Sequence, residues 1–339
     1  MKVAMLGPIA WRTPPRHYGP WERVTSLLTE GLVRRGVEVT LFATADSLTA
    51  AHLEHVAPYG YAEDPTMDGR VWEALHVGHA IDLSTGFDLV HNQLDWLPLA
   101  FAGQWGAPMV TTIHGFSGAG ILPAYQHGGS AFVSISDADR SPVLDYVATV
   151  HHGIDMQEFE STVPVGEDLV VFGRIHPDKG IADAIEIARR AARRLVICGI
   201  VQDHAYFTER VEPHIDGVRV VFRGSVGPEE RADVLASAAV LLHPIHFDEP
   251  FGLSVVEAMA SGTPVVAYRR GSMTEIIDEG VTGFTVPDID EAVVAIPRAA
   301  ALDRSLVQRR ARERFSVERM VDGYLEVYRG LLEQPGRSA

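Results

Sequence analysis

Short apolar runs alternate with longer stretches that place apolar residues at helical spacing. The first run, VAMLG, leads through a loop to the amphipathic stretch WERVTSLLTEGLVRRG, which predicts a helix over 21–36. Continuous apolar strands separated by helices are typical of parallel sheets that are covered on both faces. Strands are predicted over 3–7, 37–43, 88–92, 109–114 and 132–136 in a first series, and over 168–174, 194–199, 218–224, 239–244 and 264–268 in a second.

The polar, proline-bearing segment EFESTVPVGED separates the two series and has no apolar period. Each series predicts a doubly wound α/β domain, and after about residue 290 the chain is predicted to be helical. We therefore expect Rossmann-like domains over 1–157 and 158–314. Because ligands of open α/β sheets bind at the carboxyl ends of the strands, two such domains facing each other would enclose a binding cleft.

Composition and charge argue against several classes of protein. The chain has 339 residues and a formal net charge of −16, which argues against nucleic acid or anionic lipid as the main partner, since both need a cationic surface. The single cysteine, Cys198, excludes an internal disulfide framework and fits a reducing compartment. The apolar start is too short for a secretory signal, and no run approaches a membrane span, so a soluble cytoplasmic protein is expected.

The stretch HFDEPFGLSVVEAMASG places two glutamates around a glycine-led helix start. Glu249 follows a strand of the second series, and the N–H groups of Leu253 and Ser254 would open the helix at its positive end. Such a helix start binds phosphate, and the missing side chain of Gly252 allows a close approach. Glu257 could accept hydrogen bonds from a ribose diol, and Glu249 from a second sugar. The alternative is that both glutamates are solvated surface acids beside a core helix.

A second stretch, FGRIHPDKG, places Arg174 and Lys179 just after the first strand of the second series. A diphosphate needs cationic neutralisation, which a rigid arginine and a mobile lysine supply. The chain has only one other lysine, Lys2, so a lysine here suggests a geometric requirement. The alternative is a solvated turn. Read with the paired glutamates, the stretch predicts a site for a nucleotide diphosphate sugar.

Two other patterns are weaker. GFSGAG (115–120) is glycine-rich after a strand, but it lacks the G-x-G-x-x-G spacing of a dinucleotide loop and does not open a helix well. His151, His152, His243 and His246 could suggest zinc, but no cysteine or third ligand lies at usable spacing. A dehydrogenase and a zinc enzyme are therefore both disfavoured.

Several blocks of the sequence resemble the retaining glycosyltransferases of family 4 (GT4), which have the GT-B fold. The blocks are VHHGIDMQEF, FGRIHPDKG, EPFGLSVVEAMASGTPVVA and GSMTEIIDEGVTGFTVP, in that order along the chain. The resemblance implies two Rossmann-like domains facing a cleft and a C-terminal helix (315–339) that packs back on the N-terminal domain. It also implies a donor site of Gly19, Gly173, Arg174, Lys179, Arg223, Phe251, Gly252, Leu253, Ser254 and Glu257, with Glu249, His114, Arg174 and Lys179 carrying the chemistry.

The first half departs from the family pattern in places. Pro20 stands where a second glycine is usual, so any backbone N–H contact at that position is lost. The family's histidine after an apolar strand, close to the donor sugar, corresponds to His114; taken alone, such a histidine reads as a buried ring bonded to backbone. His152 stands where an asparagine is usual before Gly-Ile-Asp.

The resemblance implies transfer of a hexose from a nucleotide diphosphate sugar, with UDP-sugar first and GDP-mannose second, to a small-molecule or glycan acceptor. A hydrolysing 2-epimerase of the same fold and a catalytically silent nucleotide-sugar-binding homologue are the alternatives. The acceptor is expected to be soluble rather than strongly membrane-bound, because residues 1–150 hold 8 basic against 15 acidic residues.

No cofactor and no divalent metal are expected. The D-x-D pattern of Asp137 and Asp139 is separate from the donor features, because it lies in the other half of the chain. Ser136 is instead predicted to cap a helix there, with the two acids in its first turn. Arg174, Lys179 and the helix start already supply positive potential to a diphosphate.

Overall fold

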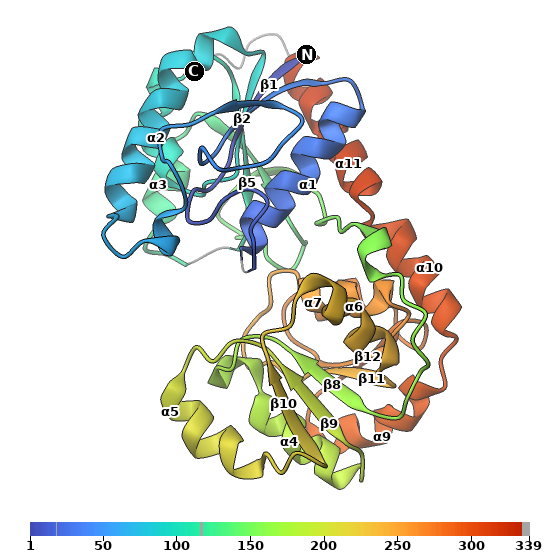
Figure 1. Cartoon of the computed structure of the whole chain (residues 1–339). Helices are drawn as coiled ribbons and strands as arrows, with labels where there is room; N and C mark the ends of the chain where they lie inside the picture. The colour runs from blue at the N-terminus through green and yellow to red at the C-terminus, as the bar shows by residue number, and fades with distance from the viewer. Residues whose placement is uncertain (18, 116–117, 334–339) are drawn as a thin grey trace. The chain divides into compact units, whose positions relative to one another are not determined.

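The computed structural model describes residues 1–17, 19–115 and 118–333, which divide into two compact units (Figure 1). Unit 1 comprises Met1–Gly153 with Val317–Ala339, and unit 2 comprises Ile154–Ser316. The boundary falls slightly before the predicted one because Ile154 already forms a parallel bridge with Ser316 of unit 2. Tyr18 and the last residues of the predicted C-terminal helix, 334–339, lie outside the described residues, as do Phe116 and Ser117 of the glycine-rich stretch.

Unit 1 is built on a seven-stranded parallel sheet in the order β3-β2-β1-β4-β5-β6-β7. All five strands predicted for the first half are present. The sequence missed β3 and β7 because they are short edge strands with a weak apolar signal. The strands are β1 (Lys2–Leu6), β2 (Glu38–Phe42), β3 (His52–Glu54), β4 (Leu89–Asn92), β5 (Met109–Ile113), β6 (Ser130–Ser134) and β7 (Tyr146–Thr149).

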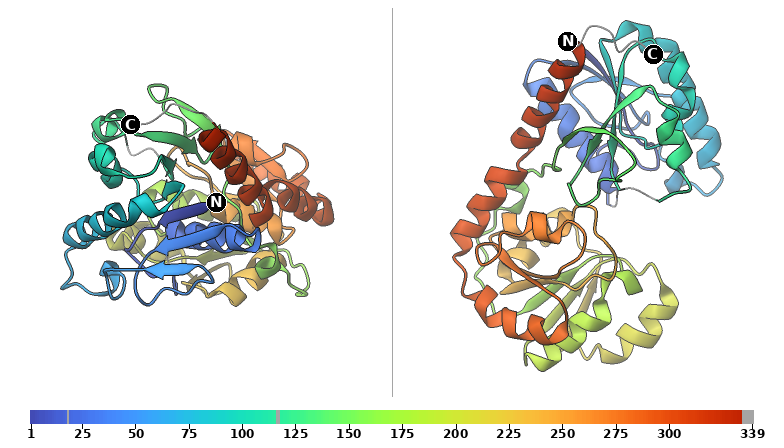
Figure 2. Two further views of the ribbon diagram at one scale, coloured as in Figure 1. Left: turned by 90° about the horizontal axis from the view of Figure 1, so that it is seen from above. Right: turned by 180° about the vertical axis from the view of Figure 1, so that it is seen from behind.

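Among the described residues of unit 1, four segments form α-helices: α1 (Pro20–Arg34), α2 (Gly69–Leu83), α3 (Leu122–Gln126) and α11 (Val317–Glu333). The last of these packs on the first, as the right-hand view of Figure 2 shows. Their approach is close, since a Cβ on Gly31 would lie 2.4 Å from Cγ2 of Val321. A glycine in α1 therefore allows the C-terminal helix to pack on the N-terminal unit.

Unit 2 is built on a six-stranded parallel sheet in the order β10-β9-β8-β11-β12-β13. The five predicted strands are present, and the missed one, β13, is again an edge strand. Its strands are β8 (Leu169–Phe172), β9 (Leu195–Cys198), β10 (Val220–Gly224), β11 (Val240–His243), β12 (Val265–Tyr268) and β13 (Gly283–Val286). Its helices are α4 (Ile181–Arg190), α5 (His204–Tyr206), α6 (Pro228–Ser237), α7 (Leu253–Ala260), α8 (Met273–Ile276), α9 (Ile289–Ala300) and α10 (Arg304–Phe315).

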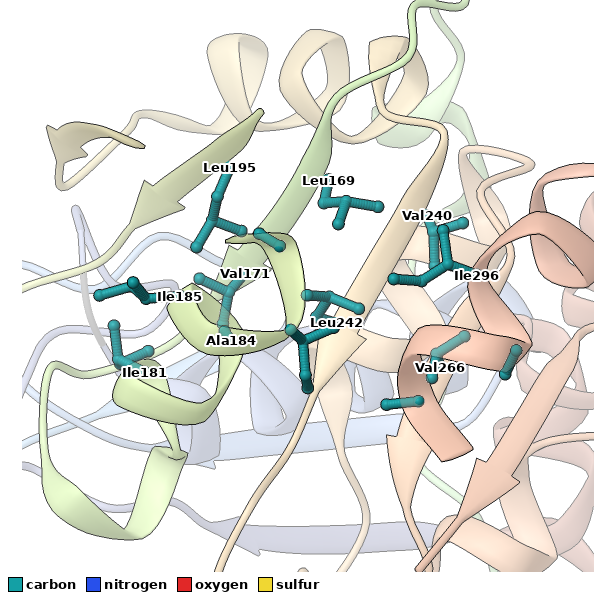
Figure 3. Close-up of a cluster of buried hydrophobic side chains, with 14 of the residues drawn as sticks. Leu169, Val171, Ile181, Ala184, Ile185, Leu195, Val240, Leu242, Val266 and Ile296 are labelled. Atoms are coloured by element: carbon teal, nitrogen blue, oxygen red, sulfur yellow. The ribbon is translucent and has the colours of Figure 1, made fainter. Parts of the chain in front are cut away.

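One face of this second sheet is covered by α4 and α9, and their apolar side chains form a continuous core with the strands (Figure 3). Leu169 and Val171 of β8 point into it, and Ile185 and Ile296 meet them from the two helices. Each fully buried side chain of this kind contributes about 1.5–3 kcal/mol to folding. The core therefore holds the strand ends, and the loops that follow them, on a rigid support.

The strand order of unit 2 reverses between β8 and β11, which makes this pair the topological switch point. Loops that leave the carboxyl ends of such neighbouring strands diverge and expose a crevice where ligands bind. The loop after β8 carries Arg174 and Lys179, and the loop after β11 carries Glu249. The fold thus brings together residues that lie far apart in the sequence. Among the described residues, no helix is long and apolar enough to cross a membrane.

Candidate active site

The turn between β8 and α4 fits closely against the loop after β11. Gly180 has a positive φ of 64°, and a Cβ there would lie 1.8 Å from the carbonyl oxygen of Pro244. The N–H of His246 donates to the carbonyl oxygen of Asp178 at 2.7 Å and ties the two loops together. Only glycine fits at position 180, and its fit fixes the position of Lys179 just before it.

Replacing Gly180 with alanine is expected to lower the free energy of unfolding by about 3 kcal/mol, because a steric clash with backbone adds to the strain of a positive φ. The matched control is Gly217→Ala. Gly217 has a similar φ of 72°, but a Cβ there would meet nothing within 4 Å, so only the strain of about 1 kcal/mol remains. Urea denaturation of both variants measures the difference. Equal losses would show that the contact with Pro244 is unimportant.

Lys179 and Glu249 form an ion pair at the switch point. The Lys179 Nζ atom lies 2.7 Å from Oε2 of Glu249, and the two side chains are only 15% and 14% exposed. The same ammonium lies 4.5 Å from the ring centroid of Phe247, a favourable cation–π distance. A cation and a carboxylate are therefore held together, largely out of solvent, at the carboxyl ends of the strands.

The carboxyl of Glu249 is held in its ionised form. Burial would raise its pKa, but the contact with the buried His243 ring, 3.7 Å away, and the charge of Lys179 outweigh burial and lower the pKa from 4.5 to about 2. Burial also lowers the pKa of His243, so this ring is neutral at pH 7. Because the pKa of Glu249 is lowered on folding, the pairing stabilises the fold above about pH 4.5, and this contribution is lost as the pH falls toward 2.

The backbone of Glu249 is fixed by the loop after β12. The N–H of Ser272 donates to the carbonyl oxygen of Glu249 at 2.9 Å. Gly271 packs so closely that a Cβ there would lie 2.4 Å from both the nitrogen and the oxygen of Glu249. Because Glu249 precedes Pro250, its own backbone is also restricted. The carboxylate thus projects from a rigid segment rather than from a mobile loop.

The start of α7 offers open N–H groups beside this carboxylate. Gly252 caps the helix in the left-handed conformation, with φ of 89°, and a Cβ there would lie 2.6 Å from Cε of Met273. In the described part of the chain, the N–H groups of Leu253 and Ser254 have no acceptor, and both residues are partly exposed. These groups and the helix dipole favour an anion at this position.

Phe251, predicted to contact the donor, does not present its ring to this site. The side chain is 2% exposed, and its ring packs edge-on against Phe315 at 5.9 Å between centroids. Its carbonyl oxygen accepts a hydrogen bond from Oγ of Ser272 at 3.0 Å. Apolar burial and this backbone bond place Phe251 as a support for the start of α7. The ring is thus turned away from the start of α7, and a donor contact of Phe251 through its backbone stays a prediction.

Glu257 lies on α7 and is almost fully buried, with 4% of the residue exposed. Both carboxylate oxygens accept hydrogen bonds from Nη1 of Arg231, at 3.0 and 3.1 Å. No sequence pattern pointed to this partner, because Arg231 lies on α6 in a stretch that reads as an ordinary polar helix. The alternative of a solvated surface acid is excluded for Glu257 by its burial.

The two predicted arginines differ in their placement. Arg174 follows β8 directly, and its guanidinium donates to the side-chain oxygen of Gln202. Arg223 lies on the edge strand β10 and forms an exposed ion pair with Glu230 at 3.1 Å. Gly173 lies against Lys179, since a Cβ there would make an ordinary van der Waals contact, 3.6 Å from Cγ of that lysine. Arg174 and Gly173 thus lie at the switch point, whereas Arg223 lies at the sheet edge.

In unit 1, His114 follows β5 and belongs to a buried polar network. Its Nε2 atom lies 2.5 Å from Oε1 of Gln93, and its Nδ1 atom lies 3.4 Å from Nε2 of His152. Trp21 of α1 stacks on the ring, with 5.2 Å between centroids and 21° between planes. Burial lowers the pKa of His114 to about 3, so the ring is neutral, and the acceptor Gln93 places its proton on Nε2. The partners are side chains rather than the backbone that a lone buried histidine would use.

Unit 1 accommodates both departures from the family pattern, Pro20 and His152. Pro20 occupies the first turn of the helix, where its missing N–H is not needed. Gly19 precedes it with a positive φ of 154°, and a Cβ there would lie 2.9 Å from Oε2 of Glu22. Burial raises the pKa of the Glu22 carboxyl to about 7. At the other departure, His152 supplies the ring that faces His114.

The D-x-D segment lies after β6 of unit 1. Ser136 Oγ accepts the N–H of Asp139 at 3.1 Å, but the residues that follow form turns rather than the predicted helix. The bond is local, and the chain runs on through Pro142 into β7 without an apolar helical period. Asp137 accepts a hydrogen bond from Thr149. The prediction of a capped helix here is therefore wrong.

The histidines whose spacing could suggest zinc lie at different places in the fold. His243 contacts Glu249, while His246 lies 3.2 Å from Asp183 and His152 belongs to unit 1. Within the residues that the structure describes, no group of three or more His, Cys, Asp or Glu side chains is arranged to hold a metal ion. Cys198 is buried at the end of β9, and burial raises the pKa of its thiol to about 12.

Three residues of these sites were not predicted as donor-site residues: His243, Arg231 and Gln93. A signal existed for His243, since it ends the strand AVLLHP at the carboxyl edge beside the predicted glutamate. Gln93 likewise follows the strand DLVHN. Position at a strand end identifies such residues as candidates, but only the fold shows that they face Glu249 and His114.

Comparison with known families covers both units. Residues 21–158 match the model described as Glycosyltransferase Family 4, and residues 166–301 match the model described as Glycosyl transferases group 1. A D-inositol 3-phosphate glycosyltransferase of Saccharomonospora viridis is 31% identical over 88% of this chain and 86% of its own length. A glycogen synthase of Mycobacterium tuberculosis is 28% identical over 92% of this chain and 89% of its own length.

Solved structures match over almost the whole chain. AviGT4, a glycosyltransferase involved in avilamycin A biosynthesis, superposes with a TM-score of 0.73 at 26% identity and covers 98% of each chain. Alr3699/HepE of Anabaena, solved in complex with UDP, superposes with a TM-score of 0.72 at 19% identity and covers 97% of this chain and all of its own.

Proposed function

Because the chain belongs to family 4 of the glycosyltransferases and has the GT-B fold, we propose that it transfers a hexose from a nucleotide diphosphate sugar with retention of anomeric configuration. The family and the fold are those predicted from the sequence blocks. UDP-sugar is proposed as the donor before GDP-mannose, because UDP-sugars are the commoner donors in the family that the sequence resembles.

The observation that carries the proposal is the arrangement of opposite charges at the switch point of unit 2. Lys179 Nζ lies 2.7 Å from Glu249, and the open N–H groups of Leu253 and Ser254 start the next helix. A donor diphosphate needs cations and N–H donors, whereas its sugar needs acceptors for hydroxyl groups. Both kinds of group meet here on rigid elements.

The roles follow from this chemistry. As the bond between the anomeric carbon and the diphosphate oxygen breaks, negative charge grows on the diphosphate. Arg174, Lys179 and the start of α7 would stabilise this charge, which is the type of preorganised electrostatics that contributes most to catalysis. Glu249, ionised at neutral pH, would accept hydrogen bonds from sugar hydroxyls and favour positive charge at the anomeric carbon. Glu257 would accept the ribose diol.

The acceptor is proposed to be water-soluble and to bind unit 1, as the resemblance implies. The acidic balance of residues 1–150 would be repelled by an anionic membrane surface. The relative named for D-inositol 3-phosphate supports a small soluble acceptor. His114, neutral and fixed by Gln93, is proposed to contact the donor sugar as its counterpart does in the family.

The test is release of nucleotide diphosphate from UDP-glucose, UDP-galactose and GDP-mannose in the presence of excess EDTA, with a panel of soluble acceptors. Because the protein's own cations and N–H groups would neutralise the diphosphate, acceptor-dependent turnover is expected to survive the chelator. Turnover that stops in EDTA and returns with Mg²⁺ or Mn²⁺ would contradict the metal-free mechanism. Donor conversion without any acceptor would instead indicate an epimerase.

A further inference from the structure

The carboxylate proposed to bind the ribose is already occupied. Arg231 Nη1 lies 3.0 Å from Oε1 and 3.1 Å from Oε2 of Glu257, so one nitrogen sits almost equally between the two oxygens. This is the position from which a vicinal diol would donate its two O–H groups to the same carboxylate. The Glu257 side chain is 6% exposed, which leaves little room for a second ligand beside the guanidinium.

Arg231 is bound less securely on its other sides. Its guanidinium carbon lies 5.5 Å from the ring centroid of Phe172, the last residue of β8. Its Nε atom is buried and has no hydrogen-bond partner within the described residues. The side chain is nevertheless 34% exposed, so a path to solvent is open to it. An arginine with one unsatisfied buried donor and access to water can leave its partner at a modest cost.

We propose that Arg231 is a specificity-determining residue of the nucleotide subsite, acting as an internal competitor that a ribose diol must displace from Glu257. The inference rests on the proposed function, since it concerns the ribose of the same donor. In the free protein Arg231 balances a carboxylate that burial would otherwise leave uncompensated. When a ribonucleotide binds, its two hydroxyls replace Nη1, and the guanidinium moves toward solvent.

The proposal predicts the direction in which replacing Arg231 changes the affinity for a ribonucleotide. With methionine at position 231, the free protein keeps Glu257 buried but without its cation. The diol then binds without breaking an existing charged hydrogen bond, so affinity for a ribonucleotide should rise. If Arg231 instead oriented Glu257 for the ribose, its replacement would lower the affinity for a ribonucleotide.

The experiment compares two nucleotides that differ only in the diol, UDP and 2′,3′-dideoxy-UDP, by titration calorimetry. The proteins are the wild type, Arg231→Met and the control Arg210→Met, which replaces an exposed arginine of the same unit. The expected result is a fall in the Kd for UDP of about tenfold in Arg231→Met, the size of one charged hydrogen bond. The Kd for the dideoxy nucleotide should be unchanged, and Arg210→Met should match the wild type.

Weaker or equal binding of UDP by Arg231→Met would overturn the proposal, and so would an equal gain for both nucleotides. If the methionine variant does not fold, Arg231→Gln is tested in the same way, because glutamine removes the charge but keeps a polar group. GDP and its dideoxy form replace the uridine pair if the wild type binds GDP instead. A wild type that binds neither UDP nor GDP would contradict the proposed function itself, which separates that failure from a failure at Arg231.

Discussion

Replacing Lys179 with alanine is expected to lower kcat at saturating donor by about 100-fold or more, because it removes one preorganised charge from the leaving diphosphate. The Lys179 ammonium is held 2.7 Å from Glu249 and faces Phe247. Because the side chain is already in place, it needs little reorganisation during the reaction. Arginine at this position should restore turnover only in part, since a planar guanidinium does not replace a compact ammonium on a fitted turn.

The matched control is Lys2→Ala, which removes the only other lysine of the chain. Lys2 lies at the start of β1 in unit 1 and makes an exposed pair with Glu38 at 3.5 Å. Initial rates over a range of donor concentrations, with thermal melts to verify folding, separate the two substitutions. Normal turnover by a folded Lys179→Ala protein would exclude the proposed role in leaving-group stabilisation.

Glu249→Ala is expected to lower kcat, whereas Glu257→Ala is expected to raise mainly the donor KM. Glu249 is proposed to face the sugar, where charge changes as the bond breaks, so its hydrogen bonds strengthen in the transition state. A ribose contact is the same before and during the reaction, so its loss weakens binding of ground state and transition state alike. Steady-state kinetics of both variants measure the two parameters.

Glu249→Gln is the more conservative comparison, because it keeps the shape while removing the charge that Lys179 balances and the neutral His243 ring contacts. It should also lower kcat if the ionised form is required. Purely KM effects of similar size from both glutamates would remove the distinction between a sugar contact and a ribose contact.

The sequence predicted the fold largely because central parallel strands are buried on both faces and carry continuous apolar runs. Runs such as DLVVFGR and AVLLHP needed no tertiary information. The three missed strands, β3, β7 and β13, are all edge strands, where pairing on one side and short length weaken the pattern. After Ser136 the error is the reverse, because a helix was predicted where the structure has none. A capping residue alone does not start a helix when no apolar helical period follows it.

The candidate site was predictable as a set of residue types but not as a set of contacts. Strand order decides that the loops after β8 and β11 are neighbours, and this order cannot be read from local patterns. The pairing of Lys179 with Glu249 follows only from that neighbourhood. Phe251 shows the same limit, because its type fits a donor contact while the helix start directs its ring into the core.

Arg231 and His243 escaped prediction for a related reason. Each acts on a glutamate that the sequence identified, yet lies on another element. The identity of such partners depends on which helix covers which strand end. At His114, likewise, the apolar strand and the histidine were visible, but Gln93 and His152 enter the network through the fold.

The most direct measurement for the central claim is a crystal structure of the protein with UDP. We predict that the diphosphate lies within hydrogen-bond distance of the N–H groups of Leu253 and Ser254 and contacts Lys179, with the ribose at Glu257 and no metal ion between protein and phosphates. A nucleotide bound away from the carboxyl ends of β8 and β11, or a diphosphate held through a metal ion, would contradict the account.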